Sequence, residues 1–474
     1  MHQERSPESE STLSRWWRGE AGLREAFLIS VPLVISSLSW TVMNFIDRLF
    51  LLSYSEDAVA AALPSGIMAF AVICFPLGIA SYASTFVAQY FGAGRHKQIG
   101  PIVWQATWLG IVAVPLAIAA IPFAPEFFRS ESTSAHIVGL EVDYFRTLSY
   151  SGGAMVMSAA LSAFFSGRGN VRVVMVVDSL SAALNIVLDY AWIFGHWGFP
   201  EAGIAGAGWA TTVAIWFKTV VYFVMFLRPR FREEFSTLVG WRFNWQQTKQ
   251  MFRYALAGGM QMQLEVTAFG LFTLLVATLG RHALAATSLA FNVNNFAFMP
   301  VWGVGMATST MVGRRLGENR ADLATHSVWS CFVWGMLYMG LICAFYVVFP
   351  ELVLWPHRQF KIEGEDFSEL EAETIVLLRF LAAFGLFDAI NILFAGALKG
   401  AGDVKFVLFG SVGIAAVSVS VTYLGMLQGL GLYWCWSVLT AWVVLLAAVF
   451  YWRFLYGPWR TMRVIEPEVE KEGS

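Results

Sequence analysis

The chain has 474 residues, of which 57% are hydrophobic and 14% charged, and its formal net charge at pH 7 is −2. A soluble domain usually has about a quarter of its residues charged, so this composition excludes an ordinary water-soluble fold. The small net charge offers no attraction for a polyanion, and we expect no nucleic-acid partner.

The chain begins with a charged stretch, residues 1–24, which we interpret as a cytoplasmic tail. Twelve apolar segments follow, most of about 20–28 residues, each long enough to cross a hydrocarbon core of ~30 Å. They are predicted at 25–54, 62–91, 101–124, 139–166, 170–195, 203–227, 248–280, 284–314, 324–355, 372–399, 404–428 and 432–456. They lack the period-two alternation of barrel strands, and a bilayer otherwise accepts only helices. The sequence therefore predicts an all-α polytopic membrane protein with 12 transmembrane helices.

Basic residues concentrate in alternate loops. If the N-terminus is cytoplasmic, most of the 31 lysines and arginines fall on the cytoplasmic side, and only four fall in outer loops: Arg129, Arg281, Arg358 and Lys361. Cytoplasmic loops of membrane proteins carry such an excess. We expect a bacterial-type inner (plasma) membrane protein with both termini in the cytoplasm.

The chain repeats itself. VAQYFGAGR near residue 92 matches VGRRLGENR near 317, and GRGNVR at 167–172 matches KGAGDVK at 399–405. The repeat divides the chain into an N-lobe of six helices at 25–227, a cytoplasmic linker at 228–247, a C-lobe of six helices at 248–456 and a C-terminal tail at 457–474. An even number of helices per half gives a parallel pseudo-symmetric repeat, with a cleft expected between two bundles. The repeated glycines are interpreted as turns at helix ends.

Three acidic residues lie inside apolar segments: Asp47, Glu265 and Asp388. A carboxylate at bilayer depth costs several kcal/mol unless it faces a cavity, a partner or an ion. The repeat aligns these acids with non-acidic residues, which favours a functional role over a structural one. Snorkelling to the interface, or pairing with a neighbouring base such as Arg48, is the alternative.

Polar side chains lie near Glu265 and Asp388 in the sequence. Gln261 lies one turn before Glu265, and Asn391 lies about one turn after Asp388. Oxygen ligands of this kind suit Na⁺ or a proton equally well, so Glu265 and Asp388 form a candidate Na⁺ or H⁺ site. We expect no other cofactor.

The fifth predicted helix carries a polar stripe. It consists of Asp178, Asn185 and Asp189, which are spaced at i, i+7 and i+11 on an otherwise apolar helix. Thr211, on the sixth predicted helix, is expected to join them. A cation site and a hydrogen-bonded clasp between helices both fit this stripe.

Six sequence motifs follow one another along the chain in the order typical of a known family. They are PLVISSLSWTVMNFID, VAQYFGAGR, GRGNVR with NIVLD, GIAGAGWATTVA, VGRRLGENR and GALKGAGDVK. With them the chain resembles the multidrug and toxic compound extrusion (MATE) transporters, NorM-like branch, over nearly its whole length. The resemblance implies an inverted-V pair of six-helix lobes that exports organic cations and other amphiphiles in exchange for H⁺ or Na⁺.

The resemblance also implies site residues. Asp47 matches the acid of the family's first helix, and Asn185, Asp189 and Thr211 match polar positions that gather around it. Glu265 and Asp388 match the pair of acids in the C-lobe. The sequence departs from the family after Asp47, where Arg48 replaces the usual threonine; an arginine there neutralises the acid or indicates an anionic substrate.

The leading functional hypothesis is therefore a secondary antiporter for small amphiphilic molecules, acting in the lipid bilayer as a monomer. A flippase for lipid-linked saccharides or another amphipathic precursor, anchored by Arg48, is the alternative. No motif of an intramembrane enzyme is present. No phosphate-binding loop is present either, so the energy source is expected to be an ion gradient.

Overall fold

The computed structural model describes residues 16–17, 19–129, 134–359 and 367–466, and all regular elements in these ranges are helices. The N-lobe contains α2 (Leu23–Tyr54), α3 (Glu56–Ser81), α4 (Ala83–Gly92), α5 (Ile99–Ala119), α6 (Ala124–Phe128), α7 (Ala135–Ser149), α8 (Gly152–Ser166), α9 (Val171–Phe194) and α10 (Gly203–Phe226). The C-lobe contains α12 (Trp245–Ala277), α13 (Arg281–Gly317), α14 (Ala321–Val348), α15 (Pro350–Gln359), α16 (Phe367–Ala401), α17 (Val404–Leu427) and α18 (Leu432–Tyr456). The short α11 (Pro229–Glu234) lies in the linker between them.

Twelve stretches of helix are long and apolar enough to cross a membrane, which confirms the predicted fold class. Three of them are composite: α3 and α4 share the span Glu56–Gly92, α5 and α6 share His96–Phe128, and α7 and α8 share Ala135–Ser166. The ninth helix is shorter than predicted over 324–355. It ends at Val348, and Pro350 starts the separate helix α15, because proline lacks an N–H and fits only the first turn of a helix.

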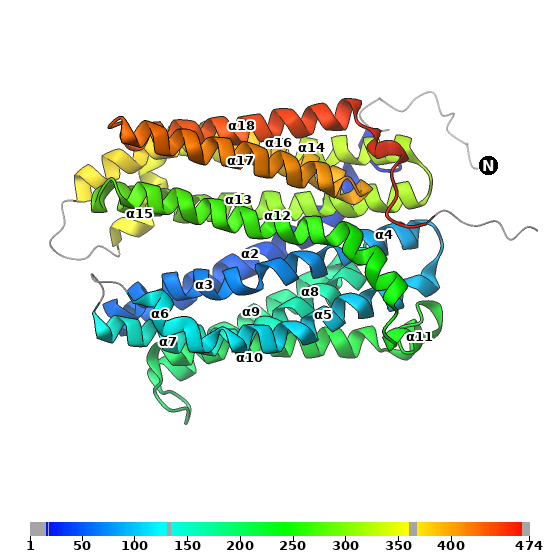
Figure 1. Cartoon of the computed structure of the whole chain (residues 1–474), viewed down its shortest axis with the longest axis horizontal. Coiled ribbons are helices and arrows are strands. Elements are labelled where there is room, and N and C mark those ends of the chain that lie inside the picture. The colour runs from blue at the N-terminus through cyan, green and yellow to red at the C-terminus, as the bar shows by residue number, and fades with distance from the viewer. Residues whose placement is uncertain (1–15, 18, 130–133, 360–366, 467–474) are drawn as a thin grey trace, which may run out of the picture.

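Both lobes are elongated bundles that lie side by side (Figure 1). We call the end of the bundle where α2 begins and α18 ends the terminal end, and the opposite one the distal end. In Figure 1 the ribbons of α3 and α12 lie close together at the terminal end, on the right, and spread apart toward the distal end. The lobes meet where α2 packs on α13, α3 on α12 and α4 on α13.

The sequence repeat corresponds to matched turns at the terminal end. Gly94 and Asn319 occupy equivalent positions and both have a left-handed backbone, with φ of 70° and 58°. Asparagine tolerates this conformation better than other residues with a side chain. Gly169 and Gly402 form the second matched pair, with φ of 77° and 104°. Each of these turns follows a helix, as in a common helix-ending motif, which confirms the structural interpretation of the repeated glycines.

Close helix packing seals the terminal end. A Cβ added at Gly92 of α4 meets the backbone carbonyl of Arg314 in α13, and one added at Gly317 meets the backbone carbonyl of Gln89. We call the contact between the lobes at this end the seam. It also includes α3 and α12, where a Cβ added at Gly78 approaches the Cα of Gly259 to 2.8 Å. The seam therefore depends on residues without side chains.

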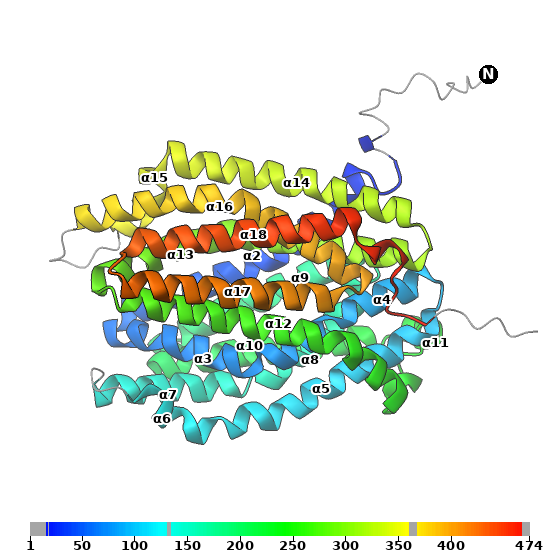
Figure 2. The same ribbon diagram turned by 45° about the horizontal axis from the view of Figure 1, so that its top comes forward.

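A segment after α18 crosses this seam. We call residues 462–466 the strap; Figures 1 and 2 show the chain turning back from α18 toward α4. Its Val464 is 2% exposed. The backbone N–H of Val464 donates to the side-chain oxygen of Gln89 in the N-lobe at 2.8 Å, and its carbonyl accepts from Gln250 of α12 at 2.9 Å. Arg95 donates to the carbonyl of Glu466 at 2.7 Å. The predicted tail at 457–474 thus begins with a packed segment that touches both lobes.

Candidate functional site

Asp47 and Asp189 lie deep inside the N-lobe. Asp47 of α2 is 6% exposed and Asp189 of α9 is fully buried. Tyr144 of α7 donates its hydroxyl to Oδ2 of Asp47 at 3.1 Å, while Oδ1 of Asp47 is buried without a partner among the described residues. α2 packs directly on α9, the helix that carries Asp189. A buried acceptor without a donor, beside a second carboxylate, favours the binding of a proton or a cation.

Asn185 and Thr211 complete this group. Asn185 is fully buried one turn before Asp189. With its amide oriented to satisfy both neighbours, Nδ2 donates to Oδ2 of Asp189 at 2.9 Å and Oδ1 accepts from the hydroxyl of Thr211 in α10 at 3.2 Å. The structure therefore brings together four predicted residues: Asp47, Asn185, Asp189 and Thr211.

Asp178 does not belong to this group. It lies three helical turns from Asp189, and at 1.5 Å per residue that distance is too long for a shared ligand. Its carboxylate pairs with Lys218 of α10 at 3.5 Å and accepts hydrogen bonds from Tyr222, at 2.9 Å, and from Ser36. The single polar stripe predicted on this helix is thus two separate clusters, and Asp178 has its own partners.

The C-lobe has a second pair of acids. Gln261 of α12 donates to Oε1 of Glu265 at 2.7 Å, and Asn391 of α16 donates to Oδ1 of Asp388 at 3.3 Å. Glu265 is exposed and Asp388 half-buried.

Arg48 points away from Asp47. Its Nη1 donates to Oδ1 of Asn292 in α13 of the other lobe at 3.1 Å. No ion pair within 4.0 Å joins Arg48 to an acid in the described ranges. Adjacent residues of a helix point in directions about 100° apart, so Asp47 faces the interior of its own lobe and Arg48 faces the C-lobe.

Four residues of these clusters were missed by sequence reasoning: Tyr144, Lys218, Tyr222 and Ser36. Lys218 carries a signal, because a lysine within an apolar helix requires a partner just as an acid does. Tyr144 carries none, since a tyrosine is ordinary in a membrane helix.

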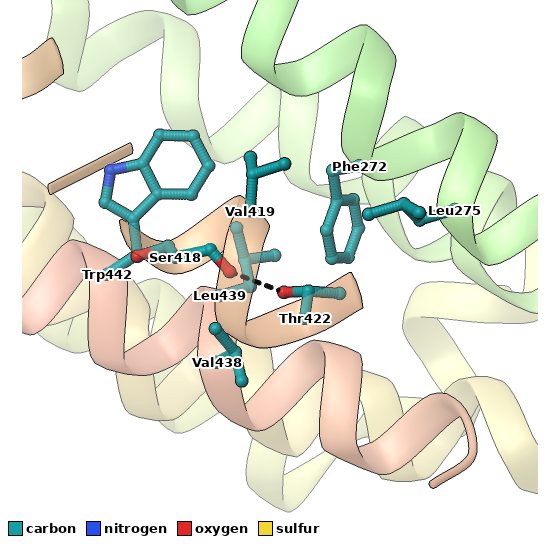
Figure 3. A pocket seen from close by; sticks show the side chains of 8 residues that line it. All are labelled: Phe272, Leu275, Ser418, Val419, Thr422, Val438, Leu439 and Trp442. Carbon is teal, nitrogen blue, oxygen red and sulfur yellow. Dashed lines mark hydrogen bonds between the residues drawn. The ribbon is translucent and has the colours of Figure 1, made fainter. Parts of the chain in front are cut away.

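A small recess lies between α12, α17 and α18 (Figure 3). It is lined by Phe272, Leu275, Ser418, Val419, Thr422, Val438, Leu439 and Trp442. Its volume of about 10 Å³ holds a single water molecule and no drug-sized ligand. None of the acids described above lines it.

Both lobes match one known protein family. A sequence model of the MatE family matches residues 32–191 and 259–424, one stretch in each lobe. The chain belongs to the MatE family. The matched stretches contain all four acids, Asp47, Asp189, Glu265 and Asp388, and the resemblance inferred from the sequence motifs is confirmed.

Relatives in the MatE family align over most of the chain. The "Probable multidrug resistance protein NorM" of Thermotoga maritima is 26% identical over 95% of this chain and 96% of its own. The "Multidrug resistance protein PmpM" of Pseudomonas aeruginosa is 27% identical over 83% of this chain and 81% of its own.

Solved structures share the fold. A MATE crystallised in the straight conformation superposes with a TM-score of 0.82 at 19% identity, covering 95% of this chain and 99% of that one. A MOP superfamily transporter from Pyrococcus furiosus, described as having a binding pocket of reversed polarity, superposes with a TM-score of 0.80 at 20% identity, covering 96% and 100%.

Proposed function

We propose that this chain is a secondary antiporter that exports amphiphilic organic molecules, organic cations among them, in exchange for H⁺ or Na⁺. The observation that carries the proposal is that both membrane-spanning lobes carry acids held by polar side chains. Asp47 and Asp189 are buried in the N-lobe, and Glu265 and Asp388 accept hydrogen bonds from amides in the C-lobe. The names of the aligned relatives support it, because they are multidrug resistance proteins.

The proposal includes an orientation. The terminal end, with the strap and the linker, is placed in the cytoplasm, because most lysines and arginines of the chain belong to its loops. The protein acts as a monomer without a bound cofactor, and it has no enzymatic activity in this proposal.

The mechanism follows from competition for the carboxylates. With Glu265 and Asp388 ionised, the C-lobe attracts the cationic part of a substrate. A proton or Na⁺ entering from the distal end neutralises one of these carboxylates, weakens the hold on the substrate and favours its release there. The coupling ion and the substrate thus bind the same charges in different states, which is the thermodynamic requirement for exchange.

The test uses purified protein in liposomes. Export of a fluorescent organic cation is followed under an imposed pH gradient and, separately, under an imposed Na⁺ gradient. We expect one gradient to drive export and the variants Glu265→Gln and Asp388→Asn to reduce the driven rate at least ~100-fold, since a neutral amide cannot exchange one cation for another. Glu56→Gln, the same change at an exposed residue of α3, serves as the matched control.

Two outcomes contradict the proposal. One is gradient-driven export by Glu265→Gln at the rate of the unmodified protein. The other is the absence of export under either gradient, which favours the flippase alternative; transfer of a fluorescent polyprenyl-linked saccharide between leaflets then becomes the next measurement.

A further inference from the structure

The linker between the lobes presents large apolar side chains to its surroundings. Val239, Trp241, Phe243 and Trp245 are between 53% and 73% exposed. They lie between α10 and α12, two helices that span the membrane, so the linker is held at the membrane surface. Aromatic side chains at this level of a membrane protein commonly lie among lipid headgroups.

Hydrogen bonds to α5 fix this part of the linker in place. Trp108 donates from its indole N–H to the backbone carbonyl of Trp241 at 2.9 Å. Gln105, which is 2% exposed, donates to the backbone carbonyl of Arg242 at 3.2 Å. Because these bonds engage the backbone, they hold the linker on the N-lobe without using the side chains of Trp241 and Arg242.

Three basic side chains border the same surface. Arg242 belongs to the linker, and Lys249 and Arg253 are spaced at i and i+4 on α12; all three are exposed. No hydrogen bond or ion pair joins their charged groups to another residue in the described ranges. The 33 residues of α12 extend about 50 Å, beyond a hydrocarbon core of ~30 Å. Its polar first turns, which carry Lys249 and Arg253, therefore lie at the level of the headgroups.

An open groove of about 550 Å³ lies where the linker, α5 and the start of α12 meet. Its lining includes the guanidinium-bearing Arg242, the apolar side chains of Val239, Phe243 and Trp245, and the amide of Gln246. A guanidinium binds a phosphate through paired hydrogen bonds. The apolar side chains offer contact to the acyl chains below such a phosphate. We call this groove, together with Lys249 and Arg253, the headgroup groove.

We propose that the headgroup groove binds the phosphate of an anionic phospholipid in the leaflet at the terminal end. Apolar side chains exposed together mark a membrane contact rather than a site for a soluble phosphate. Basic residues at the membrane surface attract lipids of net negative charge, and Lys249 and Arg253 repel the ammonium group of a zwitterionic lipid. The inference requires only that the chain spans a membrane, so it does not depend on the antiport proposal.

Native mass spectrometry of the purified protein in detergent measures bound lipid directly and needs no transport. We expect palmitoyl-oleoyl phosphatidylglycerol to bind at least about ten-fold more tightly than phosphatidylcholine with the same acyl chains. The triple variant with Arg242→Gln, Lys249→Gln and Arg253→Gln is expected to reduce this preference to less than about three-fold. Arg242→Gln alone is expected to reduce it by about three-fold, because it removes the guanidinium that lines the groove.

A matched control removes the same charge elsewhere at the terminal end. Arg24→Gln, Lys97→Gln and Lys405→Gln, combined in one chain, change three exposed basic residues outside the groove, and this variant is expected to keep the preference for phosphatidylglycerol. Unchanged binding of phosphatidylcholine shows that each variant is folded.

Three results overturn the inference. One is equal affinity of the unmodified protein for the two lipids, which reduces the exposed aromatic side chains to a general contact with the membrane. Another is an equal loss of preference in both triple variants, which indicates a diffuse attraction by the whole terminal end. The third is displacement of phosphatidylglycerol by excess glycerol phosphate, which indicates a site for a soluble phosphate.

Discussion

The N-lobe buries two carboxylates, and burying them costs free energy of folding. Asp47 and Asp189 are buried, and one carboxylate oxygen of Asp47 has no donor among the described residues. An apolar or amide side chain in either position avoids this cost. Sites that bind ions or substrates commonly retain such destabilising groups, because function requires them.

Replacing one of these carboxylates is therefore expected to stabilise the protein. Asp47→Asn keeps an oxygen that accepts from Tyr144 and removes a buried charge. We expect its midpoint of thermal unfolding to rise by a few degrees, on the order of 1 kcal/mol, while ion-driven export falls. The measurement is the thermal unfolding of purified protein in detergent. Asp322→Asn, at an exposed position of α14, is the control. A lower midpoint for Asp47→Asn contradicts the expectation that the buried carboxylate destabilises the lobe.

For single residues, the sequence identifies the acids of the candidate site but does not identify their partners. Asp47, Asp189, Glu265 and Asp388 are recognisable because a charge inside an apolar segment is costly wherever the helix packs. Their partners depend on which helices are neighbours. The bond from Tyr144 requires that α7 pack near α2, and the bond from Arg48 requires that α2 of one lobe pack on α13 of the other. A pattern along one helix does not determine either arrangement.

At the scale of helices, glycine determines how closely the lobes approach. Gly92 and Gly317 lie on α4 and α13, where any side chain meets backbone atoms of the other helix. Backbone atoms cannot move aside as a flexible side chain can, so close approach and a Cβ are incompatible here. Small residues commonly allow this packing in membranes.

A methyl group at this contact is expected to weaken the terminal seam. Gly317→Ala places its Cβ against the carbonyl of Gln89, and overpacking of this kind costs about 1–3 kcal/mol. We expect thermal unfolding several degrees lower than for the unmodified protein. Gly270→Ala is the matched control, because a Cβ at this helical position of α12 meets no atom within 4 Å. Equal unfolding midpoints for the two variants contradict the close contact.

The twelve spans follow from hydropathy because the bilayer imposes one length and one pattern on every helix. The turns of the repeat are also predictable, since Gly94, Gly169 and Gly402 need a left-handed backbone. The strap is not. Its few residues form no regular element, and their burial depends on the seam between lobes that are distant from it in sequence.

For the whole molecule, the strap connects the two lobes where they already approach most closely. Gln89 links both sides: it donates to the carbonyl of Gly400 in α16 at 2.9 Å and accepts from the N–H of Val464. Tyr82, in the turn between α3 and α4, also donates to the carbonyl of Lys399 at 3.0 Å. Opening the terminal end must break these bonds together.

Removal of the strap is expected to favour that opening. A chain ending at residue 461 lacks the contacts of Val464 and Glu466, whereas a chain ending at residue 466 keeps them and serves as the control. Spin labels at the exposed positions Lys97 and Lys405, one in each lobe, report the separation after the four buried native cysteines are replaced. Pulsed electron resonance is expected to show a larger fraction of long distances in the shorter chain. The same distance distribution in both chains contradicts a fastening function.

The strap also has a consequence for assembly. Residues 462–466 leave the ribosome only after every helix of both lobes has been synthesised. The lobes must therefore enter the membrane and find each other through helix contacts alone, and the backbone bonds across their seam form afterwards. During synthesis, quality-control proteases and chaperones therefore meet a chain whose two lobes are not yet joined by the strap.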